Sequence, residues 1–298
     1  MARLGRAHRC PTLGPVAIDL HTHSNASDGT YDPADVVAEA AAHGLTTIAL
    51  TDHDTTCGWA EASQAGLELG VAIVPGVEIS TQHHGISVHL LGYLVDPDHP
   101  GLCHEMEHAR TSRDTRMERM VANLAADGIP VTLESVRAQA KPGATLGRPH
   151  IADALVEAGY VPDRAAAFAD LLNDRSPYYV HHYAPDVVRA VALVRQAGGV
   201  PVMAHPFANR RGRTVTDHVI EQMAEAGLGG LEAFHRDHLP PERAHAVALA
   251  ERLGLFVTGS SDYHGAGKEN VIGENTTDPA VLALIEEQAT SGPTVVRA

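Results

Sequence analysis

The segment IDLHTHSNASDGT, residues 18–30, decides how this chain is interpreted, because a buried strand runs in it directly into polar side chains. Apolar residues alternate up to Leu20, a pattern typical of a β-strand, and His21 and His23 follow at once. Side chains two residues apart in a strand point to the same face, so both imidazoles should face one point. Asp28 follows in a turn that contains Gly29. The segment therefore predicts a chemical site at the end of a strand.

Length and charge narrow the class of protein. The chain has 298 residues, enough for one large domain or for one domain with an inserted subdomain. Its formal net charge of -15 argues against a general surface for long nucleic acids or anionic membranes, since Lys and Arg hold such partners. A small phosphorylated substrate remains possible if metal ions reverse the charge locally.

The cysteines and the N-terminal residues indicate in which cellular compartment the protein is expected. No disulfide framework and no Cys-type zinc site is expected from three cysteines 46 or 47 residues apart, namely Cys10, Cys57 and Cys103. Residues 1–15 are basic and lack an apolar segment, so we expect an N-terminal tail rather than a signal peptide. No stretch approaches the roughly 18 apolar residues that a membrane span needs. These features favour a cytoplasmic protein.

Apolar runs alternate with helical patterns along most of the chain. Strands are predicted at residues 16–21, 46–52, 71–80, 86–95, 200–205, 228–234 and 255–262. Strands that alternate with helices indicate an α/β fold with a mainly parallel sheet, either open or closed into a barrel. Only helical patterns occur in the middle of the chain. We therefore expect a tail (1–15), a main domain (16–99 and 181–298) and an inserted helical subdomain (100–180).

Ionisable side chains stand at or near almost every predicted strand end. They are His21, His23, Asp52, His53, Asp54, Glu78, His89, His205, Glu232, His235, Asp262 and His264. In α/β sheets and barrels, ligands bind beyond the carboxyl ends of the strands, so these groups should converge on one mouth. Imidazole and carboxylate without thiolate suit Zn, Mn or Fe. Their number exceeds the needs of one ion and indicates a multinuclear site.

Six motifs in this order resemble those of the PHP (polymerase and histidinol phosphatase) family: DLHTHS, TDHD, GVEIS, VHLLGY, AHP and GSSDYH, between residues 18 and 265. The resemblance implies a distorted (β/α)7 barrel with three divalent ions. It assigns His21, His23, Glu78 and Asp262 to the first ion. Glu78, His89 and His205 would hold the second, and Asp28, His53 and His264 the third. Asp52 has no ligand position in this scheme, so we expect it to orient a ligand.

The predicted insertion carries GRPHIADAL (147–155), which resembles the insertion of a nucleotide phosphatase-like subgroup. In that subgroup the Arg and His of this motif reach over the metal mouth to the substrate phosphate, which implies substrate contacts for Arg148 and His150. The segment EAFHRDH (232–238) resembles one that lines the pocket and adds His235. The simpler alternatives are a solvated position at the helix start for Arg148, a helix-face position for His150, and a turn-stabilising role for Asp28 beside Gly29.

Clustered divalent metals can supply a metal-bound hydroxide, clamp phosphoryl oxygens and neutralise the leaving oxygen, so no protein base is assigned. The leading hypothesis is a metal-dependent phosphoesterase that removes the 3′-phosphate of nucleoside 3′,5′-bisphosphates and leaves a nucleoside 5′-monophosphate. One alternative is a 5′–3′ exoribonuclease on short RNA, and another is a histidinol-phosphatase-like enzyme. From other classes, an amidohydrolase and a non-catalytic, metal-stabilised module stay open. The oligomeric state is not predicted.

Overall fold

The computed structural model describes residues 16–141, 144–290 and 292–298, so the predicted N-terminal tail (1–15) lies outside the described residues. Within them, seven strands form one sheet whose order follows the chain. They are β1 (Ile18–Thr22), β2 (Thr47–Leu50), β3 (Ala72–His83), β4 (Ile86–Tyr93), β5 (Val200–Met203), β6 (Gly230–Phe234) and β7 (Phe256–Gly259). Each strand overlaps one of the predicted apolar runs.

The sheet curls until its two edge strands meet. A parallel bridge joins Thr22 to Tyr263, and the His23 amide donates to the Tyr263 carbonyl at 2.8 Å. The predicted distorted seven-stranded α/β barrel is thereby confirmed. The mouth of this barrel lies where β1, β2, β5, β6 and β7 end.

One strand departs from a regular (β/α)7 pattern. β4 runs antiparallel to both β3 and β5, whereas the other neighbouring pairs are parallel. The reason is the connection: only His84 and Gly85 separate β3 from β4, both with positive φ (46° and 78°). A two-residue turn of this kind makes a hairpin, while a parallel crossover needs a dozen or more residues.

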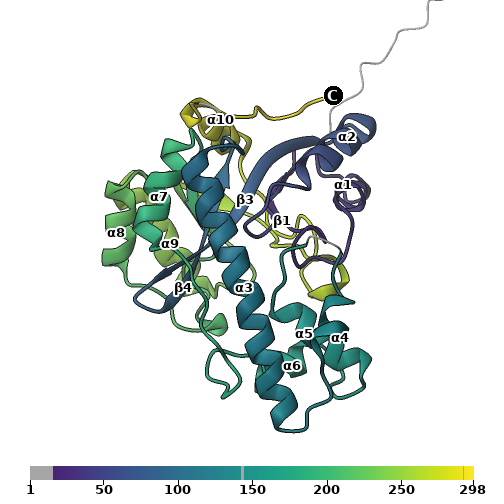
Figure 1. Cartoon of the computed structure of the whole chain (residues 1–298). Coiled ribbons are helices and arrows are strands. Elements are labelled where there is room, and N and C mark those ends of the chain that lie inside the picture. The colour runs from purple at the N-terminus through teal and green to yellow at the C-terminus, as the bar shows by residue number, and fades with distance from the viewer. Residues whose placement is uncertain (1–15, 142–143, 291) are drawn as a thin grey trace, which may run out of the picture.

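Six helices cover the outside of the barrel (Figure 1). They are α1 (Pro33–Ala42), α2 (Trp59–Leu69), α7 (Val187–Gln196), α8 (Asp217–Glu225), α9 (Pro240–Leu253) and α10 (Pro279–Gln288). α1 begins with Asp32 at the N-cap position and Pro33 in the first turn, although the Asp32 side chain makes no capping hydrogen bond. Apolar faces of the first five of these helices pack on the strands, where Val36, Ile48 and Val191 are fully buried. α10 instead adds Leu282 to a second cluster that includes Leu20 of β1.

Between β4 and α7 the chain forms α3 (Pro100–Ala126), α4 (Leu133–Arg137), α5 (Arg148–Glu157) and α6 (Arg164–Asp170). The long α3 leaves the barrel and ends beside the three shorter helices (Figure 1). These helices share an apolar core of their own, which includes Met120, Ile151 and Leu155. The start of α3 packs instead in the barrel core, through Leu102 and Met106. The domain boundaries at 100 and 180 stay a prediction.

Within the described ranges, no helix is both long enough and apolar enough to cross a lipid bilayer.

Candidate metal centre

Side chains from six strands or the loops after them meet at the barrel mouth. Three overlapping groups have ligand atoms within 4.8 Å of one another: His21, His23, Glu78 and Asp262; His53, Glu78 and His89; and His23, Asp28, His53 and His264. All these residues are buried except His89, which is partly buried. The structure thus brings together eight of the nine predicted ligands in these groups and places the ninth, His205, beside them.

Strand alternation places the first two histidines. His21 and His23 lie on the same face of β1 and at its end, with their Nε2 atoms 3.0 Å apart. Two imidazole nitrogens at this distance need a shared proton or a shared ion between them. The other ring nitrogen of His21, Nδ1, lies 2.9 Å from Glu232 Oε1 in β6, which fixes the orientation of the ring.

Glu78 is the carboxylate at the centre of the cluster. Its two oxygens lie 3.1 Å from His23 Nε2, 3.2 Å from His53 Nδ1 and 2.7 Å from His89 Nδ1. Burial would raise the pKa of Glu78, but the surrounding imidazoles hold it well below its usual value. The sequence placed Glu78 at the end of a strand; β3 instead continues five residues further, to His83, because it pairs there with β4.

The reversal of β4 explains how His89 reaches the mouth. It pairs with Ser80 in the register, in the amino-terminal half of its strand, which is the half that lies at the mouth in an antiparallel strand. His205 follows β5 with its Nε2 3.5 Å from Glu78 Oε1 and its ring 5.3 Å from that of His89. Burial is the main cause that lowers the pKa of His205 to about 3, which keeps the ring neutral and able to act as a ligand.

The third group contains ligands on loops. Asp28 Oδ1 lies 3.2 Å from His264 Nε2, and Asp28 Oδ2 lies 3.9 Å from His53 Nε2. The adjoining Gly29 permits the tight turn, because a Cβ there would lie 2.6 Å from the carbonyl oxygen of His23. Burial opposes ionisation of Asp28, yet His264 and His53 hold its pKa well below the usual value.

The backbone is strained where it carries these side chains. Asp54, His205 and Asp262 have positive φ angles of 52°, 29° and 53°, which non-glycine residues seldom adopt. Such conformations persist only where the surroundings impose them, and they concentrate at functional sites.

The donor set fits divalent cations. Among the described residues, the buried atoms His53 Nδ1 and His205 Nε2 make no hydrogen bond. Buried polar atoms are normally satisfied, so these atoms point to a partner of another kind. Neutral imidazoles and carboxylates without thiolate are the ligands that Zn, Mn and Fe prefer.

Asp262 has two sides with different neighbours. Its Oδ1 lies 3.5 Å from both His21 Nε2 and His23 Nε2, whereas its Oδ2 accepts from Arg211 Nη2 at 2.5 Å and from Lys268 Nζ at 3.2 Å. Sequence reasoning assigned neither cation to Asp262, although the loop that holds Arg211 is basic enough to meet a substrate phosphate. Lys268 lies outside the strand ends, and Arg211 belongs to the basic stretch ANRRGR, which has the composition of a solvated loop.

Asp52, predicted to orient a ligand, holds the loop that carries Asp28. Its oxygens accept from the Ser24 amide at 2.8 Å, from the Ser24 hydroxyl at 2.7 Å and from the Ser27 hydroxyl at 2.6 Å. Burial raises the pKa of Asp52 to about 7, against the effect of these hydrogen bonds. The carboxylate that orients a histidine directly is Glu232, which the sequence had placed at this end of the barrel without a role.

The three predicted substrate residues lie in different surroundings. Arg148 at the start of α5 donates to the Leu172 carbonyl at 2.7 Å, with its guanidinium over the rings of Phe168 and Tyr179. His150 is buried, and its Nδ1 accepts from the Gly147 amide at 3.0 Å. His235 is fully buried, with Nε2 3.6 Å from Asp262 Oδ2.

Two arginines of α3 that the sequence did not single out also face inward. Arg113 is 8% exposed and contacts both Asp54 Oδ2, at 3.3 Å, and the Ser80 hydroxyl. Arg116 is 6% exposed, lies over Tyr179, and has no carboxylate partner among the described residues. Burial and the nearby Arg148 lower the pKa of Arg116 to about 9. The available signal was their i, i+3 spacing beside the apolar Met117 and Met120 on the same helix.

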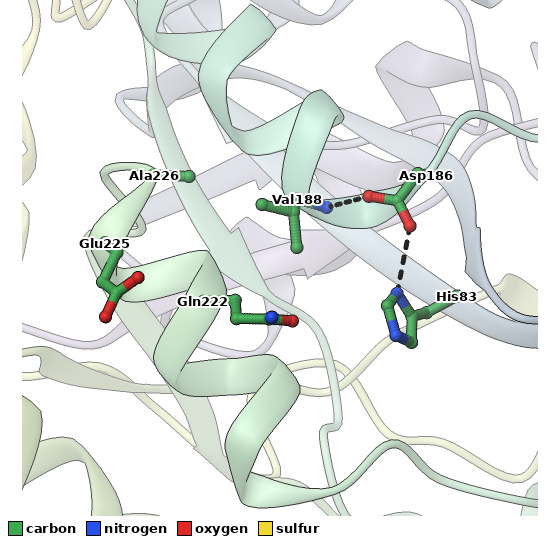
Figure 2. Close-up of a pocket in the computed structure, with 6 residues that line it drawn as sticks. All are labelled: His83, Asp186, Val188, Gln222, Glu225 and Ala226. Carbon is green, nitrogen blue, oxygen red and sulfur yellow. Dashed lines mark hydrogen bonds and ion pairs between the residues drawn. The ribbon is translucent and has the colours of Figure 1, made fainter.

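Figure 2 shows a surface pocket that is lined by none of the proposed metal ligands. Its six lining residues include His83 and Asp186, which share a hydrogen bond of 3.0 Å between Nδ1 and Oδ2. Asp186 also accepts the Val188 amide with its other oxygen, so it caps α7 and ties the β3–β4 hairpin to that helix. The contact is explained by this structural role.

Comparisons with known proteins agree with the geometry. The PHP domain family matches residues 19–157. A 3′,5′-nucleoside bisphosphate phosphatase from Chromobacterium violaceum is 35% identical over 84% of this chain and 88% of its own length. A 5′–3′ exoribonuclease from Haemophilus influenzae is 32% identical over 83% of this chain and 89% of its own length.

Among solved structures, one from Bifidobacterium adolescentis carries the description of a metal-dependent phosphoesterase. It is 40% identical to this chain, covers 93% of it and 98% of its own length, and superimposes with a TM-score of 0.89. Identity of this extent, together with the barrel and the clustered His and carboxylate side chains, shows that the chain belongs to the PHP family and is a metal-dependent phosphoesterase.

Proposed function

We propose that the enzyme hydrolyses the 3′-phosphate of nucleoside 3′,5′-bisphosphates and releases a nucleoside 5′-monophosphate and inorganic phosphate. The observation that carries the proposal is a second cationic group separate from the barrel mouth. Arg113, Arg116 and Arg148 gather between α3 and α5, in the inserted helices that stand over the mouth. The similarity to a 3′,5′-nucleoside bisphosphate phosphatase supports the same substrate class.

The three arginine side chains lack enough carboxylate counter-charges. Only Arg113 has a carboxylate partner, Asp54; Arg116 and Arg148 have none within 4 Å among the described residues. Buried cations are costly unless a counter-charge accompanies them, and a guanidinium fork matches the oxygens of a phosphate. A substrate with two phosphates would satisfy both places, with one phosphate at the barrel mouth and the other on these arginines.

Three divalent cations, each Mn, Zn or Fe, complete the proposal. His21, His23, Glu78 and Asp262 would hold the first, Glu78, His89 and His205 the second, and Asp28, His53 and His264 the third. Proximity supports His53 as a further ligand of the second ion, because it approaches Glu78. It likewise supports His23 as a further ligand of the third ion, because it approaches Asp28. When bound, such ions supply Lewis-acid stabilisation of the phosphoryl oxygens and of the leaving oxygen.

The chain's own residues would orient and enclose the substrate. His235 Nδ1 accepts the Asp237 amide at 3.1 Å, so in the neutral ring the proton sits on Nε2, which faces the mouth. That N–H can donate to a phosphoryl oxygen. His150 and the start of α5 stand beside Asp28, and a Cβ at Gly147 would lie 3.9 Å from Asp28 Oδ2. Arg116 and Arg148 would bind the phosphate that is not cleaved.

A 5′–3′ exoribonuclease on short RNA is the second candidate, favoured by the 32% identity to such an enzyme. The enclosed arginines argue for a small substrate rather than long nucleic acid, since Arg113 and Arg116 are less than 10% exposed.

We place the enzyme in the cytoplasm, which the free thiols of Cys57 and Cys103 support.

A substrate panel tests the proposal. Purified enzyme with Mn is offered adenosine 3′,5′-bisphosphate, adenosine 5′-monophosphate, histidinol phosphate and a 5′-phosphorylated RNA trimer, and products are separated by chromatography. We expect inorganic phosphate and 5′-monophosphate from the bisphosphate, loss of turnover with a chelator, and recovery when Mn or Zn is restored. Turnover of the trimer without turnover of the bisphosphate would make the exoribonuclease the correct choice.

A further inference from the structure

The proposed cation sites differ in what supports their ligands. The ligands of the first site lie in or next to barrel strands, and all of them are at most 1% exposed. The third site depends on two loops, one after β1 that carries Asp28 and one after β7 that carries His264 together with Asp262 of the first site. Loops have more conformational freedom than paired strands, so this site needs additional support.

The connection between α4 and α5 of the inserted subdomain contacts the first of these loops through Lys141 and Thr145. The Thr145 amide donates to the Ala26 carbonyl at 3.1 Å, two residues from Asp28. Lys141 pairs with Asp32, and the same carboxylate oxygen accepts from the Asn25 side chain. Contacts therefore bracket Asp28 on both sides.

The inserted helices also fasten the second loop. Arg164, at the start of α6, binds Asp153 of α5 through two hydrogen bonds of 2.5 Å, from Nε to Oδ1 and from Nη2 to Oδ2. Its remaining Nη1 donates to the Gly267 carbonyl at 3.3 Å, in the short helix η2 (Gly265–Gly267) directly after His264. A bidentate Arg–carboxylate pair has a fixed geometry, so it presents this N–H to the loop in one direction.

The two loops contact each other as well. The Thr30 amide donates to the His264 carbonyl at 3.1 Å, and the Ala266 amide donates to the Thr30 hydroxyl at 2.9 Å. Inserted helices and both loops thus form one connected unit, with Asp28 and His264 inside it, 3.2 Å apart.

We infer that docking of the inserted helices on the barrel builds the third cation site, so that docking and binding of that ion strengthen each other. The inference rests on the proposed cation assignment. Arg164 and Lys141 are positioning residues in this scheme, because neither reaches an ion itself. Coupling between two binding events is reciprocal: if docking raises the affinity for the ion, the ion must favour the docked state by the same factor.

The first test measures metal content. Wild-type enzyme and the variant Lys141→Met/Arg164→Met are dialysed against a series of free Mn concentrations, and bound Mn per chain is determined by mass spectrometry. We expect three ions on the wild type, and on the variant two ions of unchanged affinity with a third bound about 10-fold more weakly, within the usual range of coupling. Lys141→Met alone should weaken binding of the third Mn ion by a smaller factor. Because Lys141 is exposed, this single variant should fold normally and tests whether misfolding explains the double variant.

A matched control is Arg137→Met. Arg137 pairs with Glu118 inside the inserted helices, 3.5 Å away, and makes no hydrogen bond or ion pair with the barrel within the described part of the chain. The substitution Arg137→Met removes an arginine and an ion pair from the same subdomain. Because Arg137 does not hold the loops of the third site, all three Mn affinities should stay unchanged. If this control also binds the third Mn ion more weakly, the effect comes from general loosening of the subdomain. That result would overturn the inference.

The second test measures the reciprocal effect through hydrogen exchange at the Thr145 amide, which reports directly on its bond to Ala26. In the wild type, filling the third site with Mn should slow this exchange about 10-fold, and the double variant should lose most of that protection. Unchanged Mn binding and exchange in the double variant would overturn the inference and leave the proposed function intact. A wild type that binds no Mn, Zn or Fe would instead contradict the proposed function.

Discussion

Asp52 accepts both the backbone amide and the hydroxyl of Ser24, at 2.8 and 2.7 Å, so one carboxylate joins the end of β2 to the loop that leaves β1. The same two-bond arrangement occurs twice more around the mouth, between Asp19 and Ser261 (3.0 and 2.5 Å) and between Asp54 and Ser80 (2.8 and 2.6 Å). These pairs connect neighbouring segments that carry the cation ligands. They fix the geometry of the segments that carry these ligands.

Asp52→Asn should destabilise the protein. An amide at this position presents an NH2 group to donors that need an acceptor, which leaves at least one buried donor unsatisfied. We expect a loss of roughly 1–3 kcal/mol in the free energy of unfolding, measured by urea denaturation in the presence of a chelator. Asp170→Asn, at an exposed position, is the matched control and should change the stability little.

Asp262→Asn and His53→Ala should each abolish turnover, because each removes a proposed ligand. Mn content should fall by at least one ion per chain in both variants, which separates loss of metal from loss of a proton donor. Near-normal turnover of the Asp262 variant would refute the proposed site.

Arg116→Met and Arg148→Ala should weaken binding of the bisphosphate and leave the chemical step largely intact. Loss of one charge-assisted hydrogen bond costs about 1.5–3 kcal/mol, or roughly 10- to 100-fold in KM. Steady-state kinetics with the bisphosphate measure the effect. Arg119→Met, an exposed arginine on the same helix, should behave as the wild type. An equal loss in kcat with unchanged KM would remove the second phosphate position from the proposal.

His182 should make the protein sensitive to acid. Burial, followed by Arg113 and Arg116, lowers the pKa of His182 from 6.5 to about 2. Between these two values the unfolded chain binds a proton at this residue and the folded chain does not, so stability falls as the pH falls below 6.5. His182→Gln should therefore gain stability relative to the wild type between pH 7 and pH 5. Urea midpoints measured across that range, with a chelator present, should converge or cross; parallel curves would contradict the expectation.

Much of the site could be predicted because strand alternation is a local property. The pairing of His21 with His23, and the placement of His53 and Asp262 at strand ends, depend only on where apolar runs stop. The reversal of β4 could have been found in the HG pair at residues 84–85, since two residues between strands make a hairpin.

The inward arginines could not be predicted from the same signals. Arg113 and Arg116 stand in a helix whose sequence is polar on most sides, and their burial arises only when segment 179–183 and α5 pack against it. Arg211 likewise reaches Asp262 across 51 residues of sequence. Contacts of this kind depend on the tertiary arrangement, which a single sequence does not reveal.

The backward direction of β4 also sets a distance. Because β4 travels away from the mouth, the chain leaves it at the opposite end of the barrel and must return along the barrel's full height before it can cover the opening. α3 makes that return as one uninterrupted element of 27 residues, about 40 Å at 1.5 Å per residue. Its Arg110 and Arg113 touch Asp54 partway along, and its far end carries the smaller helices beyond the rim. The length of α3 thus sets how far its side chains lie from the barrel opening. Adding or deleting a turn near its start would rotate and shift Arg113 and Arg116 relative to that opening.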